Sequence, residues 1–247
     1  MRWPHDDFLD VKVKPVTRNG FRNRILDGLP AKELSRITKA LTKVDAEIRN
    51  EIYEPNKPFK HVYFPETAIA SVVNVLEDGS EIEVATIGYE GMVGLPVYLG
   101  TNQSPARSFW QVAGTAYRLD AAFLEKEKRS RSPLAATLGI YTQGFLAQVA
   151  QSVTCNRVHN LEQRCARWLL MTHDRVEGDD FPLKQEFLAQ MLGVRRAGIS
   201  EVAGRLQRKR LIKYSRGWMK VMNRDGLERL SCECYRVVAR EYRRLLG

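Results

Sequence analysis

The sequence predicts an α+β fold made of an antiparallel β-roll, a long helix and a C-terminal winged helix-turn-helix. Three observations predict it: short apolar runs broken by turn residues over Ala46–Leu119, helical apolar spacing after Pro133, and a helix pair followed by two short strands within residues 182–223. The chain has 247 residues, enough for two domains. The expected division is an arm at 1–20, the roll at 21–129, the long helix at 130–159 and the winged helix-turn-helix at 160–247.

The roll is predicted from strands that alternate with turn signals. Ile69–Leu76 and Glu81–Ile87 flank the turn residues Glu77–Ser80, and the second run alternates apolar and polar residues as a half-buried strand does. Short helices are expected before the strands of the roll, between Arg24 and Leu41, where leucine and isoleucine recur at helical spacing. Several short strands at this spacing indicate an antiparallel roll or barrel.

A long amphipathic helix is predicted after the roll. Its apolar stripe recurs every three or four residues and consists of Leu134, Leu138, Tyr141, Phe145 and Val149. The stripe has two interpretations, a helix packed on its own domain or the seam of a dimer. We favour the dimer seam, because so long a stripe needs a matching apolar partner. A second helix is expected over Leu161–Val176.

The positive charge is concentrated at the C-terminal end. The net charge is +10, and residues 182–247 carry 16 Lys/Arg against 6 Asp/Glu, so the preceding residues are balanced. A neutral body joined to a basic end indicates a module that binds a polyanion, since neutralising phosphates drives such binding. The alternative is a basic face that only meets solvent.

The basic end contains the helix-turn-helix pattern. Gln185–Leu192 is predicted as the first helix and Arg195–Lys209 as the second. Ala189 is small where two helices must touch, and Gly193 suits a left-handed turn between them. The second helix is amphipathic, so it has one buried face and one outward face.

Candidate DNA contacts follow from this pattern. The outward face at the start of the second helix offers four residues to base edges in a major groove: Arg196, Ala197, Ser200 and Glu201. The alternative for Arg196 and Glu201 is a solvated surface pair. Seven basic residues of this helix and the following wing are expected to meet phosphates: Arg195, Arg205, Arg208, Lys209, Lys213, Arg216 and Lys220.

The wing is predicted from Leu211–Tyr214 and Trp218–Met222, two short strands around a turn that contains Gly217. Asp225 is expected to cap one last amphipathic helix over Leu227–Leu246. We interpret the arginines on the outer face of that helix as solubility charge.

The cysteines and histidines give no recognisable metal site in the sequence. The chain has four cysteines, Cys155, Cys165, Cys232 and Cys234. Cys232 and Cys234 lie in a predicted helix, where residues two apart point to different sides, and no second pair has zinc-ligand spacing. The four histidines are scattered. We therefore expect idle or buried thiols and no metal.

No apolar stretch is long enough to cross a bilayer, and the first residues have no apolar signal core. The expectation is a cytoplasmic protein without a membrane partner.

The chain resembles the CRP/FNR family of bacterial transcription regulators. The resemblance is strongest over Gln185–Arg196 and continues through Gly204–Leu206 to Leu211–Ile212, while Gly91–Gly94 and Arg107–Trp110 resemble the family's phosphate-cassette region. It implies a cyclic-nucleotide-binding-like roll and a homodimer that binds a near-palindromic operator in double-stranded DNA. It also implies RNA polymerase as a partner.

The resemblance breaks down at the effector site. Cyclic-AMP binders of the family have Gly-Glu-Leu where this chain has Gly94-Leu95-Pro96, so the carboxylate that takes the ribose hydroxyl is missing. A buried unpaired hydroxyl costs about 1–3 kcal/mol, which disfavours cyclic AMP. The remaining candidates for an effector pocket are Gly94, Leu95, Arg107 and Ser108, and Arg107 has the alternative of a structural ion pair.

Other sensing chemistries of the family also find little support in the sequence. The family's iron–sulfur sensors carry an N-terminal cysteine cluster, whereas no cysteine precedes Cys155, so an iron–sulfur cluster is not expected. No histidine lies in a recognisable haem-ligand pattern.

Three alternatives compete with a regulated DNA-binding protein. The first is a constitutive regulator with an empty roll. The second is a nucleotide-binding regulatory subunit that acts on an acidic protein partner. The third, an enzyme, is disfavoured because the sequence has no nucleophile–base set, metal-ligand spacing or phosphate loop.

Overall fold

The computed structural model describes residues 17–247. Residues 1–16 of the predicted arm lie outside the described residues. The described elements, in chain order, are α1 (Arg24–Asp27), α2 (Ala31–Thr38), β1 (Thr42–Ala46), β2 (Glu51–Tyr53), β3 (His61–Pro65), β4 (Ile69–Val75), β5 (Glu81–Ile87), α3 (Leu95–Leu99), β6 (Arg107–Val112), β7 (Gly114–Asp120), α4 (Ala121–Arg129), α5 (Pro133–Val158), α6 (Leu161–His173), β8 (Asp180–Pro182), α7 (Gln185–Met191), α8 (Arg196–Arg208), β9 (Ile212–Ser215), β10 (Trp218–Val221), α9 (Arg224–Leu230) and α10 (Glu233–Leu246).

The predicted antiparallel roll is confirmed. It has one sheet in the order β1-β7-β3 and one in the order β2-β6-β4-β5, and neighbouring strands within each sheet pair antiparallel. The β4–β5 hairpin turns where the sequence predicts it, with Ala70 opposite Ile87. Two short helices of the roll, α3 and α4, are not predicted by the sequence.

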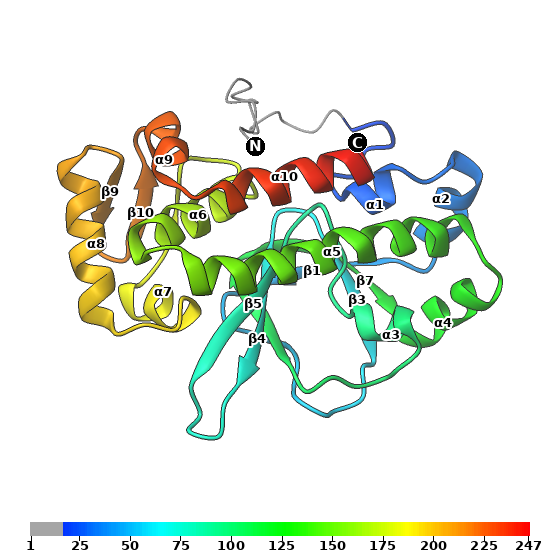
Figure 1. Ribbon diagram of the computed structural model, residues 1–247. Helices are drawn as coiled ribbons and strands as arrows, with labels where there is room; N and C mark the ends of the chain where they lie inside the picture. Colours follow the sequence, from blue (N-terminus) through cyan, green and yellow to red (C-terminus); the bar gives the residue numbers. More distant parts are fainter. Residues whose placement is uncertain (1–16) are drawn as a thin grey trace.

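Helix α5 runs along the roll, and α10 lies beside it (Figure 1). Ser132 caps its start by accepting a hydrogen bond from the backbone N of Ala135, and Pro133 occupies the first turn. These two residues explain why the helix starts there. It continues for 26 residues to Val158.

The interpretation of the predicted α5 stripe as a dimer seam is wrong. Leu134, Leu138 and Tyr141 are fully buried within the chain's own core, and Tyr242 of α10 stacks on Tyr141 with ring centroids 6.4 Å apart. Because the chain's own core covers these three residues completely and Phe145 and Val149 partly, the stripe is packed within the chain rather than turned to a second subunit. The alternative, a helix packed on its own domain, is confirmed.

A second apolar stripe lies on the uncovered side of α5. Its largest members are Ile140, Leu146 and Val153, whose exposed fractions are 46%, 57% and 68%. Ala136 and Ala150 are exposed at matching positions, so exposed residues recur at steps of three or four along 136, 140, 143, 146, 150 and 153. This is the spacing of a coiled-coil seam.

The predicted wing is confirmed, and it has a third strand. The sheet order is β8-β10-β9, and β8 pairs with β10 so that Phe181 lies opposite Met219. The sequence does not predict β8, which lies beyond the end of the predicted helix Leu161–Val176. That helix, α6, ends earlier than predicted, at His173.

The single C-terminal helix predicted by the sequence is in fact two helices. The chain is extended at Ser231, with ψ of 159°, and this separates α9 from α10. The cap is Asn223, which accepts a hydrogen bond from the backbone N of Gly226, rather than the predicted Asp225.

The roll and the C-terminal region share a buried boundary. Phe109 of β6 meets Phe187 of α7 with centroids 6.0 Å apart, and the indole Nε1 of Trp168 donates to Glu83 at 2.9 Å. Burial raises the pKa of Glu83, and the hydrogen bonds it accepts oppose that rise. These contacts dock α6 and α7 on the roll. No helix among residues 17–247 is long and apolar enough to cross a membrane.

Candidate nucleic-acid interface

The helix-turn-helix is built from α7, a tight turn and α8. Gly193 has φ of 61°, the left-handed conformation that the sequence predicts for it, and the backbone N of Val194 donates to the carbonyl O of Ala189 at 2.9 Å. Ile199 and Val202 are buried and fix the inner face of α8 in the core. The first and last residues of α7 and α8 each lie within one residue of the predicted ones.

All four candidate base-reading residues lie on the exposed side of α8. Arg196 pairs with Glu186 at 3.0 Å, Ser200 donates to Gln185 at 2.6 Å, and Glu201 accepts from Arg205 at 2.6 Å. Arg196 and Glu201 therefore each pair with a different residue rather than with each other. Exposed ion pairs contribute little free energy, so the side chains can exchange these partners for bases at small cost.

The seven candidate phosphate contacts fall into two groups. Arg205 and Lys209 both reach Glu162 of α6, at 3.5 Å and 2.7 Å, and the hydrogen bond from Lys209 lowers the pKa of Glu162. Their charge is therefore partly neutralised within the chain. The other five, like Lys209, are exposed: Arg195, Arg208, Lys213, Arg216 and Lys220.

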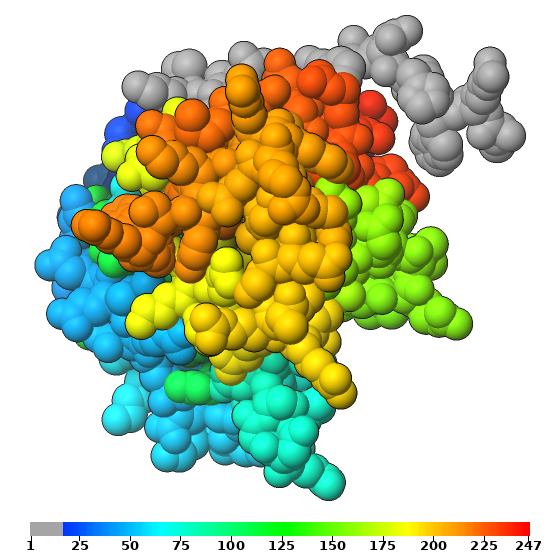
Figure 2. All heavy atoms as spheres, turned by 90° about the vertical axis from the view of Figure 1, so that its left-hand side faces the viewer, coloured from blue at the N-terminus to red at the C-terminus, as the bar shows by residue number. Residues whose placement is uncertain are grey.

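Helix α8 and the wing form one outer face at the end of the molecule (Figure 2). Arg216 and Gly217 both have positive φ, 51° and 81°, and make the tight turn that joins β9 to β10. Arg216 thus lies at the tip of the wing. This face carries basic side chains from two elements, as a surface that follows a DNA backbone requires.

The structure does not gather the four candidate effector residues into one pocket. Gly94 begins α3 with φ of 100°, and a Cβ there would lie 2.8 Å from Cγ1 of Val62. Leu95 is buried beside it in the core that contains Val62. These two residues pack against the roll rather than open a cavity.

Arg107 and Ser108 are adjacent on β6 and are already engaged. Arg107 pairs with Glu81 at 2.6 Å and with Glu51 at 2.7 Å, and the hydrogen bond to Glu81 raises the pKa of Arg107. The Ser108 hydroxyl donates to the carbonyl O of Ser71. Because two carboxylates occupy the guanidinium, an anionic ligand would have to displace them. This geometry favours the structural role of Arg107.

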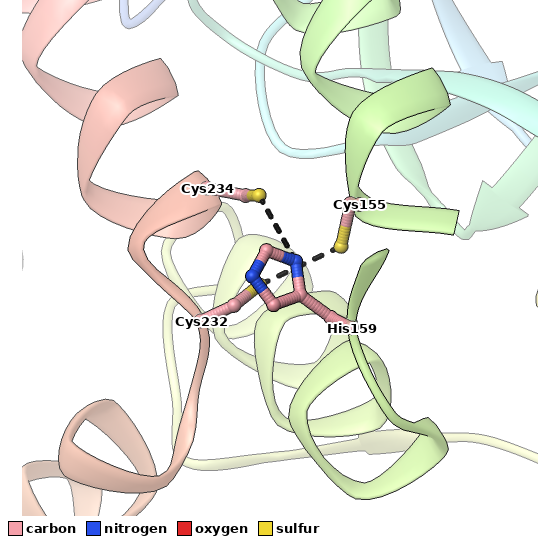
Figure 3. Close-up of side chains that lie close together, drawn as sticks. All are labelled: Cys155, His159, Cys232 and Cys234. Atoms are coloured by element: carbon pink, nitrogen blue, oxygen red, sulfur yellow. Dashed lines mark hydrogen bonds between the residues drawn. The ribbon is translucent and has the colours of Figure 1, made fainter. Parts of the chain in front are cut away.

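Sequence reasoning missed a cluster of cysteine and histidine side chains. The ligand atoms of Cys155, His159, Cys232 and Cys234 all lie within 4.8 Å of one another (Figure 3). Cys165 is buried elsewhere, in the core under α6 and α7. A hydrogen bond with Cys232 and the positive charge of Arg167 lower the pKa of Cys155, although burial opposes them.

The prediction that Cys232 and Cys234 point to different sides of a helix is wrong for a local reason. Cys232 is not inside a helix but is the extended residue that precedes α10, with ψ of 162°. Two residues that span a helix start can turn to the same side. The available signal was the spacing of Cys155 and His159, four apart at the end of a helix and so on one face.

The comparisons with known proteins agree with this fold. Residues 163–230 match the family described as the Crp-like helix-turn-helix domain. No curated protein matches the chain. The solved structure of FixK2 from Bradyrhizobium japonicum is similar, with a TM-score of 0.67 at 18% identity, and the match covers 78% of this chain and 98% of that one.

Two structures from Thermus thermophilus are also similar. The CRP-family transcriptional regulator TTHB099 has a TM-score of 0.62 at 19% identity, covering 77% of this chain and 96% of that one. The CRP/FNR-family transcriptional regulator TTHA1359 has a TM-score of 0.58 at 16% identity, covering 77% and 98%.

The match to the Crp-like helix-turn-helix domain identifies the class of protein as a DNA-binding transcription regulator. Residues 163–230 match the Crp-like helix-turn-helix domain family, and the chain has the fold of the solved CRP/FNR regulators, so the fold that the resemblance implies is confirmed.

Proposed function

We propose that this regulator acts as a homodimer that binds a near-palindromic site in double-stranded DNA. The observation that carries the proposal is the exposed face of α8, where Arg196, Ser200 and Glu201 lie beside the basic wing. Such a protein works where the DNA is, so the proposed location is the cytoplasm. RNA polymerase is the proposed partner at promoters.

The proposed dimer forms along the exposed stripe of α5. Ile140, Leu146 and Val153 have coiled-coil spacing and no partner within the described chain that removes them from solvent. Pairing with the same stripe of a second copy would bury them across a twofold axis. Each copy would then present its α8 to one half-site, about one DNA turn apart.

The proposed division of work on DNA separates base contacts from phosphate contacts. Arg196 can donate two hydrogen bonds to a guanine, Glu201 can accept from a cytosine amino group, and small Ala197 lets the helix approach closely. Lys213, Arg216 and Lys220 of the wing hold phosphates and carry no sequence information. Arg195, which precedes α8, and Arg208, its last residue, serve the same purpose.

Control by a small effector in the roll is a separate part of the proposal. An effector would act by shifting the docking of α6 and α7 on β5 and β6, and so the spacing of the two α8 helices. The double ion pair of Arg107 favours an effector other than a cyclic nucleotide phosphate at this arginine. It equally favours the alternative of a constitutive regulator. Titrating candidate nucleotides while measuring DNA affinity separates the two.

The Arg196→Ala variant tests the base-reading role. We expect it to weaken binding to the preferred duplex by about 1–3 kcal/mol, or about ten- to a hundredfold in Kd, because a bidentate contact to one base is lost. Binding to a scrambled duplex should change far less. The measurement is a Kd for both duplexes after the preferred site has been selected from random DNA.

Lys220→Ala is the matched control from the wing. It should weaken both duplexes to a similar degree and lower the salt dependence of binding by about one unit of slope. If Arg196→Ala behaves as Lys220→Ala does, Arg196 does not read a base. If the unaltered protein prefers no duplex, the basic end serves another partner, such as an acidic protein.

A further inference from the structure

The cysteine–histidine cluster joins two segments that lie far apart in the sequence. Cys155 is in the last turn of α5 and His159 directly follows that helix, whereas Cys232 precedes α10 and Cys234 lies in its first turn. The Sγ atoms of Cys155 and Cys232 are 3.5 Å apart, and Sγ of Cys234 is 3.5 Å from Nδ1 of His159. The four side chains converge on one point from both segments (Figure 3).

We propose that Cys155, His159, Cys232 and Cys234 bind one Zn²⁺ ion. Three thiolates and one imidazole are a common ligand set of closed tetrahedral zinc sites. With Zn–S distances of about 2.3 Å, the ligand atoms of an ideal tetrahedron lie about 3.8 Å apart. The separations in the cluster, from 3.5 Å to at most 4.8 Å, lie around this value.

The surroundings of the histidine support a metal rather than a plain hydrogen-bonded cluster. Nδ1 of His159 faces the sulfur atoms, while its Nε2 lies 3.2 Å from the carboxylate of Glu233. A carboxylate that accepts from the remote ring nitrogen is the usual partner of a zinc-bound histidine, because it fixes the tautomer and the ring orientation. The amide of Gln151 donates to Sγ of Cys234 at 3.1 Å, as hydrogen bonds to a metal-bound thiolate do.

The local charge also suits the site. Three thiolates around one Zn²⁺ leave one net negative charge, which needs compensation where water is excluded. Arg164 and Arg167 of α6 both interact electrostatically with Cys155, and each keeps an Nε that has no hydrogen-bond partner among the described residues. Their positive charge compensates the site.

The burial of the ligands indicates a structural ion. The three thiols are at most 2% exposed, and the His159 side chain is 10% exposed. Four protein ligands leave no open position for substrate or water, as in structural rather than catalytic zinc sites. The ion would tie the end of α5, next to the chain segment that leads into the DNA-binding domain, to the start of α10.

A disulfide is the competing fate of these thiols. The 3.5 Å between Cys155 and Cys232 is well beyond an S–S bond of about 2.05 Å. A disulfide between Cys155 and Cys232 would also not explain why Cys234 and His159 are directed to the same point as these two thiols. An iron–sulfur cluster fits less well, because its ligands bind different irons and are held farther apart than around a single ion.

The test is the metal content of the full chain, purified under reducing conditions without a histidine tag and dialysed with a weak chelator. We expect about one zinc per chain by elemental analysis. Cys234→Ser and His159→Ala should lose that zinc. Cys165→Ser, which alters an equally buried thiol outside the cluster, should retain it.

A second measurement keeps the test decisive if a variant fails to fold. Zinc in the unaltered protein is replaced by Co²⁺, and the visible spectrum should show the intense bands of tetrahedral cobalt with thiolate ligands. The proposal is overturned if the folded, reduced protein contains no zinc and gives no such spectrum. Stoichiometric iron, or a Cys155–Cys232 disulfide mapped in anaerobically purified protein, would also overturn it.

Discussion

Arg175→Met should lower the free energy of unfolding by about 3–5 kcal/mol, because it leaves the buried carboxylate of Glu90 without its counter-charge. Arg175 donates to Glu90 from Nε at 3.1 Å and from its terminal nitrogen at 2.8 Å, and both residues are buried. A Cβ on Gly88 would lie 2.6 Å from this side chain, so the guanidinium stem fills its site closely. Chemical denaturation at neutral pH measures the loss.

The pH dependence provides a second readout of the same ion pair. Burial alone would raise the pKa of Glu90, but the charge and hydrogen bonds of Arg175 outweigh it and hold this pKa below its usual value. Because the pKa of Glu90 is lower in the folded than in the unfolded state, the ion pair stabilises the fold at pH values above the usual carboxylate pKa. This stability is lost as the pH falls through the folded-state pKa. In Arg175→Met, burial should raise the pKa of Glu90 instead. The difference in free energy of unfolding between this variant and the unaltered protein should therefore become smaller at acid pH.

The double variant Arg175→Met/Glu90→Gln is the control for this prediction. It removes both charges, so it should recover much of the stability that the single variant loses. A deficit in Arg175→Met that does not change with pH would mean that lost packing, not the unpaired charge, causes the loss.

Leu146→Glu should prevent dimer formation and weaken binding to a palindromic duplex by about a hundredfold or more, since two linked half-site contacts become one. Leu146 lies in the middle of the exposed α5 stripe and is 57% exposed in the single chain. Residues of a parallel pair on a twofold axis meet their own copies, so the substitution places two carboxylates opposite each other. Light scattering measures the mass, and a duplex titration measures the Kd.

Leu99→Glu is the matched control, because Leu99 is the last residue of α3, is not part of the stripe and is 56% exposed. It should leave the mass and the Kd unchanged. A Leu146→Glu variant that remains dimeric would show that the subunits pair through another surface. A dimer that persists while DNA binding fails would instead locate the defect in the DNA-binding domain.

Local features of the sequence were sufficient for most of the elements and for the DNA-binding face. The β4–β5 hairpin, the wing and the two helices of the helix-turn-helix follow from apolar periodicity and from glycines at their turns. The exposed side of α8 follows from the same periodicity, because the residues opposite the buried apolar face of a helix must point to solvent. The domain boundaries and the contacts with DNA stay predictions.

Segments with short local signals were harder to predict. β8 has three residues, too few for a recognisable strand pattern. It forms a strand because its backbone pairs with the edge of β10. The break at Ser231 interrupts an apolar pattern that is typical of one continuous helix, so the sequence predicts α9 and α10 as a single element.

By itself, the sequence determined the order of roll, long helix and winged helix-turn-helix, and the location of the positive charge, because helical and strand periodicity are local properties of the chain. Only the tertiary structure decided which face of α5 is covered. Both of its stripes are apolar, and one of them is buried because α10, a distant segment of the chain, packs against it. The same packing of α10 on α5 brings Cys232 and Cys234 to Cys155 and His159. Proximity between distant segments depends on how the whole core closes, which no local spacing encodes.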